Sequence, residues 1–205
     1  MRIAVLGATG QTGRQLVRQA LARGHEVVAL ARDPRQLTPA PGLTVAVADV
    51  FAPATVRAAL SGVDAVASGL GARGKVDGTL AAGAAAVVAA NLGRVVWLGS
   101  LGTGASRGHG GALVDTLIPL LLRKELADKA RGEALVRGAG GTVVHAGPLG
   151  NGDGLGGARL VAVADFRARF WPRVIARADV AALMLDELTQ AKHRGETAIA
   201  QPRNH

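Results

Sequence analysis

The feature that most constrains the fold is a set of three glycines, Gly7, Gly10 and Gly13, between an apolar segment and a segment with helical periodicity. Residues 2–6 have the composition of a short buried strand, and residues 14–23 place their apolar side chains on one helical face. Glycines at this spacing let bare backbone approach a pyrophosphate, which the first N–H groups of the helix and its positive dipole end then hold. The segment therefore predicts a dinucleotide-binding turn between a strand and a helix.

Each glycine has a separate expected task. Gly7 permits the tight turn, Gly10 lets the phosphates approach without a Cβ in the way, and Gly13 lets the helix pack closely on the strand. Glycine-rich turns are common in a chain with 29 glycines, so the prediction depends on the strand before this turn and the helix after it.

The residues after the second predicted strand indicate which dinucleotide binds. NAD-binding folds usually place a carboxylate here against the ribose 2′-hydroxyl, whereas NADP-binding folds use an arginine against the 2′-phosphate. This strand ends in Arg32, and Arg35 follows one turn later, so two guanidinium groups are expected to converge on the phosphate. Asp33 comes one residue past the usual carboxylate position. The pattern favours NADPH; the alternative is that Arg32 only ends a strand in solvent.

Strand-like and helix-like segments alternate along the whole chain without a linker. Further strands are expected at residues 43–48, 63–68, 94–99, 142–146, 160–163, 173–176 and 197–200. Helices are expected at residues 53–61, 76–91, 112–137 (kinked or divided at Pro119) and 178–191. This alternation predicts an α/β fold with a doubly wound parallel sheet of the Rossmann type, covered by helices on both faces. Residues 1–205 are expected to form one domain, with substrate-side loops at about 100–112 and 147–175.

Composition narrows the function. The formal charge of +9 comes from arginines scattered along the chain, without the interleaved aromatic residues that stack bases, so no specific nucleic-acid partner is expected. Apolar runs are too short to span a bilayer and no cleavable apolar segment is present, which predicts a soluble, cytoplasmic protein without a membrane partner. With no cysteine and no ligand spacing among the five histidines, no metal site is expected. A monomer is weakly favoured.

Three side chains are candidates for catalysis. Ser100 follows the fifth strand, where a short hydroxyl faces a nicotinamide lying over the sheet; the alternative is a serine that caps the next loop. Lys129 lies in a helical segment and is by position alone a solvated surface residue. His109, in the loop after Ser100, is placed to supply a proton, against the alternative of a mobile loop histidine. His145, inside the sixth strand, is expected to be packed in or beside the sheet.

Six short motifs together resemble a known family. They are Gly-Ala-Thr-Gly-Gln-Thr-Gly from residue 7, Ala-Arg-Asp-Pro-Arg from residue 31, Ala-Asp-Val from residue 48, Gly-Ala-Arg from residue 71, the serine after strand five and Arg-Ala-Asp-Val-Ala from residue 177. The chain resembles the atypical short-chain dehydrogenase/reductase group. Within it, the chain is most similar to the NAD(P)H-binding proteins like biliverdin-IXβ reductase, also called NADPH-dependent flavin reductase.

The resemblance implies a set of binding residues. Those that hold NADP in the family correspond to Gly7, Thr9, Gly10, Gln11, Thr12, Gly13, Arg32, Arg35, Asp49 and Val50. Those that border the nicotinamide and substrate correspond to Gly71, Arg73 and Ser100, and Pro148 in the loop after strand six is also assigned to the cofactor. Lys129 falls where the family's Tyr-x-x-x-Lys lysine would lie, and the tyrosine position is then Glu125.

The chain departs from the family pattern because it contains no tyrosine at all. Without the phenol as general acid, ordinary alcohol dehydrogenase or epimerase chemistry is not expected. A conjugated acceptor such as a flavin, a quinone or a linear tetrapyrrole can take hydride and spread the charge through its own π system, with the proton arriving from solvent. The expected function is an NADPH-dependent reductase of such an acceptor; the alternative is a non-catalytic NADP(H)-binding redox sensor with a protein partner.

Overall fold

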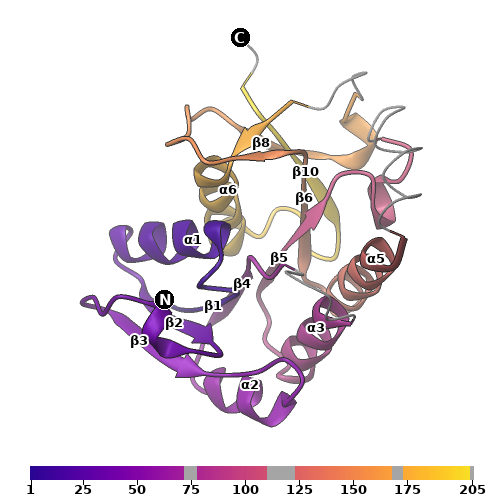
Figure 1. Ribbon diagram of the computed structural model, residues 1–205. Coiled ribbons are helices and arrows are strands. Elements are labelled where there is room, and N and C mark those ends of the chain that lie inside the picture. The colour runs from indigo at the N-terminus through magenta and orange to yellow at the C-terminus, as the bar shows by residue number, and fades with distance from the viewer. Residues whose placement is uncertain (72–77, 110–122, 168–172, 204–205) are drawn as a thin grey trace.

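A computed structural model describes residues 1–71, 78–109, 123–167 and 173–203. Eight strands form one sheet, flanked by helices on both faces (Figure 1), which confirms the predicted doubly wound α/β fold. Across the sheet the order is β3 (Leu43–Val47), β2 (Glu26–Ala31), β1 (Arg2–Leu6), β4 (Ala65–Ser68), β5 (Val95–Ser100), β6 (Thr142–Ala146), β10 (Thr197–Gln201) and β8 (Arg159–Ala162).

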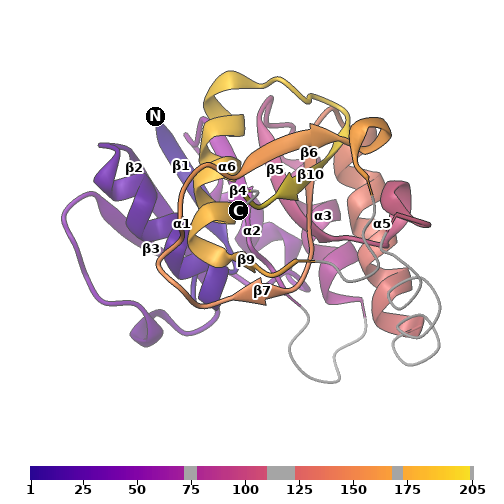
Figure 2. The ribbon, with the colours of Figure 1, turned by 90° about the horizontal axis from the view of Figure 1, so that it is seen from above.

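Seven of the eight strands are parallel, and β8 alone pairs antiparallel, with β10. The predicted parallel sheet is therefore observed as a mostly parallel sheet with one antiparallel edge strand. An antiparallel edge strand is common on an otherwise parallel sheet, because the chain returns to the edge without a crossover helix. A separate short parallel pair, β7 (Leu149–Gly150) with β9 (Ile175–Ala176), lies next to the start of α6 (Figure 2).

The helices form two layers. On one face lie α1 (Gln11–Ala22) and α6 (Arg177–Gln190), and on the other lie α2 (Pro53–Ala59), α3 (Thr79–Ala89) and α5 (Arg123–Gly138) (Figure 1). Successive strand residues point to opposite layers: Ile3 and Val5 join the cluster with α1 and α6, whereas Ala4 and Leu6 join the cluster with α2, α3 and α5. Strands buried on both faces read as continuous apolar runs, which is why they could be located from the sequence.

Small residues bring α3 and α5 close together. A Cβ on Gly132 of α5 would lie 2.9 Å from the carbonyl oxygen of Leu80, so glycine permits this approach. The buried Asp128 carboxylate accepts hydrogen bonds from the backbone N–H groups of Leu80 (2.9 Å) and Ala81 (3.0 Å). A carboxylate from α5 thus satisfies the first turn of α3, where a negative charge is favoured by the helix dipole.

Several predicted boundaries moved. The helix expected at 76–91 is observed from Thr79 and ends at Ala89, and Asn91 takes the left-handed φ of 51° that terminates a helix. Of the long helix expected at 112–137, α5 accounts for Arg123–Gly138. Residues 112–122, with Pro119, lie outside the described residues. Strand β4 begins at Ala65 rather than at residue 63, β9 is shorter than expected, and β7 occupies part of the expected loop at 147–157.

Within the described residues, no helix combines the length and the apolar character needed to cross a membrane.

Candidate functional site

The turn between β1 and α1 has the geometry of an anion site. Gly7 has a φ of 74°, and a Cβ there would lie 2.8 Å from the backbone of Leu70, so only glycine fits. Helix α1 begins after Gly10 without a side-chain cap and without an acidic residue in its first turn. The first N–H groups of a helix have no partner within it, so those of α1 are available to an anion at this turn.

Glycine is required at position 13 and suits position 10 for different reasons. A Cβ on Gly13 would overlap the carbonyl group of Gly7, so this glycine lets α1 approach the end of β1. Gly10 has an ordinary φ of −73°, and a Cβ there would lie 3.2 Å from the Gly7 carbonyl oxygen. Its backbone conformation suits any residue, and the bare surface is what a close phosphate needs. The turn therefore fits the pyrophosphate of a dinucleotide.

A cavity of about 360 Å³ opens at the carboxyl ends of the parallel strands, beside this turn. It gathers most of the predicted site residues, from loops far apart in the sequence. Those that line it are Gly7, Thr9, Gly10, Gln11, Thr12, Arg32, Asp49, Val50, Gly71, Ser100 and Lys129.

Four of the other predicted residues do not line the cavity. Gly13 lies behind the turn. Pro148 accepts a hydrogen bond at its carbonyl oxygen from the backbone N–H of Ile175 (2.9 Å), which places it directly before β7 and next to β9. The His109 ring lies 3.3 Å from the Arg107 carbonyl oxygen, and its backbone N–H donates to the Ser106 carbonyl oxygen (3.0 Å), both in its own loop. Arg35 lies on the surface, paired with Asp33. Arg73 lies outside the described residues.

The two arginines after β2 have different environments. Arg32 is exposed, lines the cavity and has no ion-pair partner within the described part of the chain. Arg35 instead forms a two-point ion pair with Asp33, with distances of 2.9 and 3.0 Å from Nε and Nη2 to the carboxylate oxygens. Hydrogen bonds from Arg35 hold the pKa of Asp33 below its ordinary value. Of the two arginines Arg32 lines the cavity and Arg35 does not, and the expected convergence of both on the phosphate stays a prediction.

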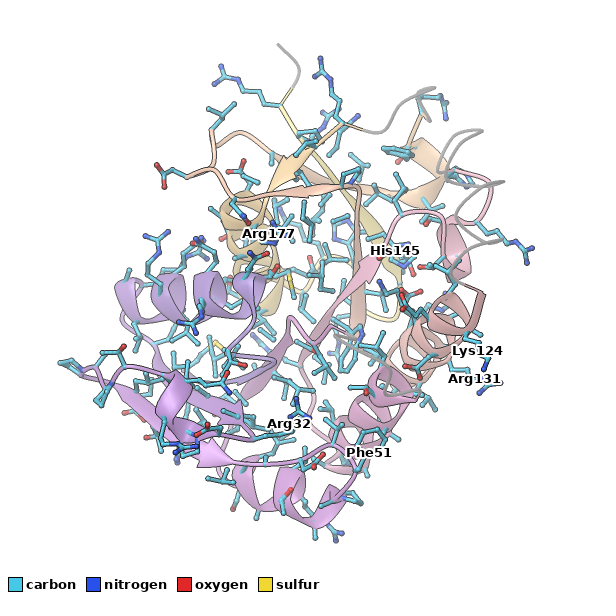
Figure 3. The ribbon with its side chains drawn as sticks, in the orientation of Figure 1. Arg32, Phe51, Lys124, Arg131, His145 and Arg177 are labelled. Atoms are coloured by element: carbon cyan, nitrogen blue, oxygen red, sulfur yellow. The ribbon has the colours of Figure 1, made fainter. Side chains whose placement is uncertain are left out.

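Sequence reasoning missed an aromatic ring that lines the same cavity as Arg32. Phe51 is 52% exposed and lines the cavity directly after Asp49 and Val50. The Asp49 carboxylate accepts a hydrogen bond from the backbone N–H of Phe51 (3.0 Å), which fixes this turn. Figure 3 shows Arg32 and Phe51 toward the same end of the molecule. An exposed phenyl ring at the wall of such a cavity can stack on a planar base such as adenine.

Ser100 and Lys129 meet inside the cavity. The Lys129 Nζ donates a hydrogen bond to the Ser100 Oγ at 2.6 Å, joining the end of β5 to α5. Burial lowers the pKa of Lys129, and the negative charges of Glu133 and Glu125 act in the opposite direction. The interpretation of Lys129 as a solvated surface residue is therefore wrong. Glu125, at the family's tyrosine position, is exposed and does not line the cavity.

Arg177 was noted in a motif but given no role. It begins α6 and lines the cavity, and its Nη1 donates hydrogen bonds to the Leu149 carbonyl oxygen (2.9 Å) and to the Asn151 Oδ1 (2.6 Å). Figure 3 shows it well apart from Arg32, on the α6 side. The sequence signal was its place in the motif from residue 177, but the contact with the loop after β6 could not be foreseen. Within the described residues, no group of three or more His, Asp or Glu side chains is arranged to hold a metal ion.

The fold and the glycine turn define a nucleotide-binding protein of the Rossmann type. The family model described as NAD(P)H-binding matches residues 7–191, so the chain belongs to the NAD(P)H-binding family. This confirms the resemblance to the atypical short-chain dehydrogenase/reductase group.

Among curated proteins, a photosystem II assembly factor from Synechocystis is 43% identical over 68 residues, which is 32% of this chain and 21% of that protein. The match thus spans about a fifth of that relative's length.

Solved structures show the same fold over nearly the whole chain. A Streptococcus pneumoniae protein proposed to be an NADH-flavin reductase is 24% identical, with 99% of this chain and 100% of that chain covered and a TM-score of 0.78. An anaerobilin reductase from Escherichia coli O157:H7 is 20% identical, with 100% and 98% covered and a TM-score of 0.77. A Veillonella parvula short-chain dehydrogenase/reductase in complex with NADP is 17% identical, with 99% and 95% covered and a TM-score of 0.81.

Proposed function

We propose that the protein is an NADPH-dependent oxidoreductase that transfers hydride to a conjugated acceptor such as a flavin, a quinone or a linear tetrapyrrole. The observation that carries the proposal is the 2.6 Å hydrogen bond from Lys129 to Ser100 inside the cavity. It supplies a proton donor at the end of β5 in a chain that has no tyrosine. The names of two structural neighbours, a flavin reductase and a tetrapyrrole reductase, agree with this acceptor class.

The cavity residues fit the cofactor. The backbone of the glycine turn and the start of α1 would hold the pyrophosphate, Arg32 the 2′-phosphate, and Asp49 with Phe51 the adenosine end. When bound, the nicotinamide supplies the hydride. The remaining contributions come from side chains of this chain.

The proton has a direct route. Reduction of the acceptor by NADPH consumes one proton, giving NADP⁺ and the acceptor with two added hydrogens. In our proposal the Ser100 hydroxyl gives its proton to the reduced acceptor while the Lys129 ammonium replaces it through the existing hydrogen bond. Solvent then returns a proton to Lys129. The lowered pKa of Lys129 makes its ammonium group a better proton donor than a solvated lysine.

The test follows NADPH oxidation at 340 nm with FMN, riboflavin, biliverdin and several quinones, using the wild-type protein and Ser100→Ala. We expect turnover with one acceptor class and loss of about 10²-fold or more in kcat in the serine variant. Full turnover by Ser100→Ala would remove the serine from the mechanism.

The choice of NADPH over NADH is tested at the two arginines. We expect Arg32→Gln to weaken NADPH binding about 10- to 100-fold, as for loss of a charge-assisted hydrogen bond, and to leave NADH binding nearly unchanged. Arg35→Gln is the matched control, because Arg35 is paired with Asp33 and does not line the cavity. Titration by NADPH fluorescence measures both. Equal losses for the two cofactors in Arg32→Gln would contradict the proposed 2′-phosphate contact.

A second candidate is a protein that binds NADP(H) without turnover and signals to a partner. It is favoured by the name of the curated relative, an assembly factor rather than an enzyme. The match to that relative covers 32% of this chain. Tight NADPH binding with no oxidation by any acceptor of the panel would support this candidate over the reductase.

A further inference from the structure

A cluster of buried polar side chains lies directly behind Ser100, outside the cavity. It consists of Glu133 on α5, His145 on β6, and Thr103 and Ser106 in the turn after β5, all less than 5% exposed. The Thr103 Oγ1 lies 2.9 Å from the Glu133 Oε1, and the Ser106 Oγ lies 2.7 Å from the His145 Nδ1. The His145 Nε2 lies 3.1 Å from the Glu133 Oε2, without the alignment of a hydrogen bond.

The cluster has the residue types of a hydrolytic Ser-His-Glu triad but not its accessibility. Ser106 is fully buried, and its Oγ already accepts a hydrogen bond from the backbone N–H of Gly102 at 2.9 Å. A nucleophile needs contact with its substrate, which this serine lacks. Any contribution of the cluster to chemistry must therefore pass through the residues that it touches.

Two contacts connect the cluster to Ser100. The Thr103 Oγ1 lies 2.6 Å from the Ser100 carbonyl oxygen and 2.9 Å from the Glu133 Oε1, so its single proton is shared between these two acceptors. Gly99, the residue before Ser100, packs on the cluster: a Cβ there would lie 2.5 Å from both the Glu133 Oε1 and the His145 Cδ2. The backbone that carries Ser100 is thus fixed by the position of the Glu133 carboxyl group.

Glu133 also acts on Lys129. The two residues are four apart on α5, so they share one helix face. Glu133 is the larger of the two negative influences that raise the pKa of Lys129 against the effect of burial, and Glu125 is the smaller. Of the elements packed on α5, β6 contributes His145, whereas α3, β5 and the turn Gly104–Ser106 contribute no ionisable side chain. The other charged groups of α5 near Lys129 are Lys124, Asp128 and Arg131.

We propose that Glu133, packed against His145, is a positioning residue for proton delivery: it holds the backbone of Gly99 and Ser100 in place and sets a carboxylate one helical turn from the Lys129 ammonium. The proposal rests on the proposed reductase function. It explains why a buried carboxylate and imidazole, which are costly to bury, lie next to the cavity.

The first test measures Lys129 directly and needs no turnover. The chain has only four lysines, so ¹³C-labelled lysine gives a spectrum in which Lys129→Arg identifies the Lys129 signal. A pH titration of that signal is compared in the wild type, Glu133→Gln and Glu125→Gln. We expect a clearly lower pKa for Lys129 in Glu133→Gln and a smaller decrease in Glu125→Gln, the control that removes a charge four residues away on the exposed side. An unchanged Lys129 pKa in Glu133→Gln would overturn the proposal, even if no acceptor is found.

The second test uses turnover and NADPH affinity. In Glu133→Gln we expect the alkaline limb of the kcat profile to move to lower pH, because Lys129 loses its proton earlier, while the Kd for NADPH changes less than about twofold. Glu133→Asp, which restores the charge, is expected to return the limb toward higher pH. A uniform loss of kcat at all pH values, with no movement of the limb in either variant, would show a structural role only. Thermal unfolding of each variant identifies those that fail to fold.

Discussion

The two ends of strand β6 carry similar buried clusters with different surroundings. At its carboxyl end, His145 lies against Glu133 beside the cavity. At its amino end, Thr142 lies against Glu187, whose carboxylate also faces His193. Both clusters combine a glutamate, a histidine and a threonine, and both glutamates are less than 5% exposed.

At the amino end, the Glu187 carboxylate has donors besides a threonine, although the single Thr142 proton is shared between Glu187 and the His193 carbonyl oxygen (3.0 Å). The Glu187 carboxylate is reached by the Thr142 hydroxyl (3.0 Å), the His193 backbone N–H (2.8 Å) and the His193 Nδ1 (3.0 Å). At the carboxyl end, the single Thr103 proton is shared between Ser100 and Glu133, and the His145 Nε2 is not aligned with the carboxylate. The difference is that His193 gives the Glu187 carboxylate two further donors, whereas within the described residues Glu133 has the Thr103 hydroxyl as its aligned donor. Where donors are too few, the charge is left to act on a neighbour, here Lys129.

The comparison predicts its largest change in kcat at one of the two lysines near the clusters. Lys129→Met should lower kcat about 10²- to 10⁴-fold, the usual contribution of a positioned acid, while NADPH still binds. Lys192→Met, beside His193 and exposed, is the matched control and should leave kcat unchanged. Steady-state kinetics with the best acceptor measures both. Equal kcat values in the two variants would break the distinction between the clusters.

A smaller effect is expected at the two threonines. Thr103→Val and Thr142→Val each remove a buried hydroxyl that contacts a glutamate, so each should lower the free energy of unfolding by about 1–3 kcal/mol. Only Thr103→Val should also reduce kcat, since the Ser100 carbonyl loses its contact. Urea unfolding and kinetics are measured on the same preparations. A kcat loss in Thr142→Val as large as in Thr103→Val would mean that stability alone controls turnover.

The smallest effect is the pH dependence of the wild type. Burial lowers the pKa of Lys129 from its ordinary value of 10.5, and neutral Lys129 has no proton to give. The kcat should therefore fall as pH rises, with an apparent pKa below 10.5. Glu187→Gln should leave this alkaline limb in place because Glu187 belongs to the other end of β6. If the alkaline limb of the kcat profile moves in Glu187→Gln, the limb does not arise from Lys129 and its neighbours alone.

The fold and the glycine turn could be predicted because their signals are local. Buried parallel strands are continuous apolar runs, and Gly7 to Gly13 follow one of them directly. The β8 orientation could not be predicted, because a short edge strand carries no sign of its direction. The Arg35 and Asp33 ion pair was within reach of sequence reasoning, since the two residues are only two positions apart in the chain.

The interior of the site was out of reach for a different reason. Ser100 and Lys129 are 29 residues apart, and their contact depends on how α5 lies along the sheet. The same packing brings Glu133 next to His145. The sequence predicted that His145 is packed in or beside the sheet, but it gave no partner for it. Phe51 carried no signal beyond its place after Asp49 and Val50, since a single exposed aromatic residue is ordinary on a protein surface.

The missing side chain at Gly99 has a consequence for the evolution and redesign of this protein. Because a methyl group there would press on both Glu133 and His145, a side chain at position 99 requires those two side chains to move. Substitution of Gly99 is expected to be tolerated better after a smaller residue replaces Glu133 or His145. The three positions are therefore epistatic, and a library that varies Gly99 alone will return mostly damaged proteins.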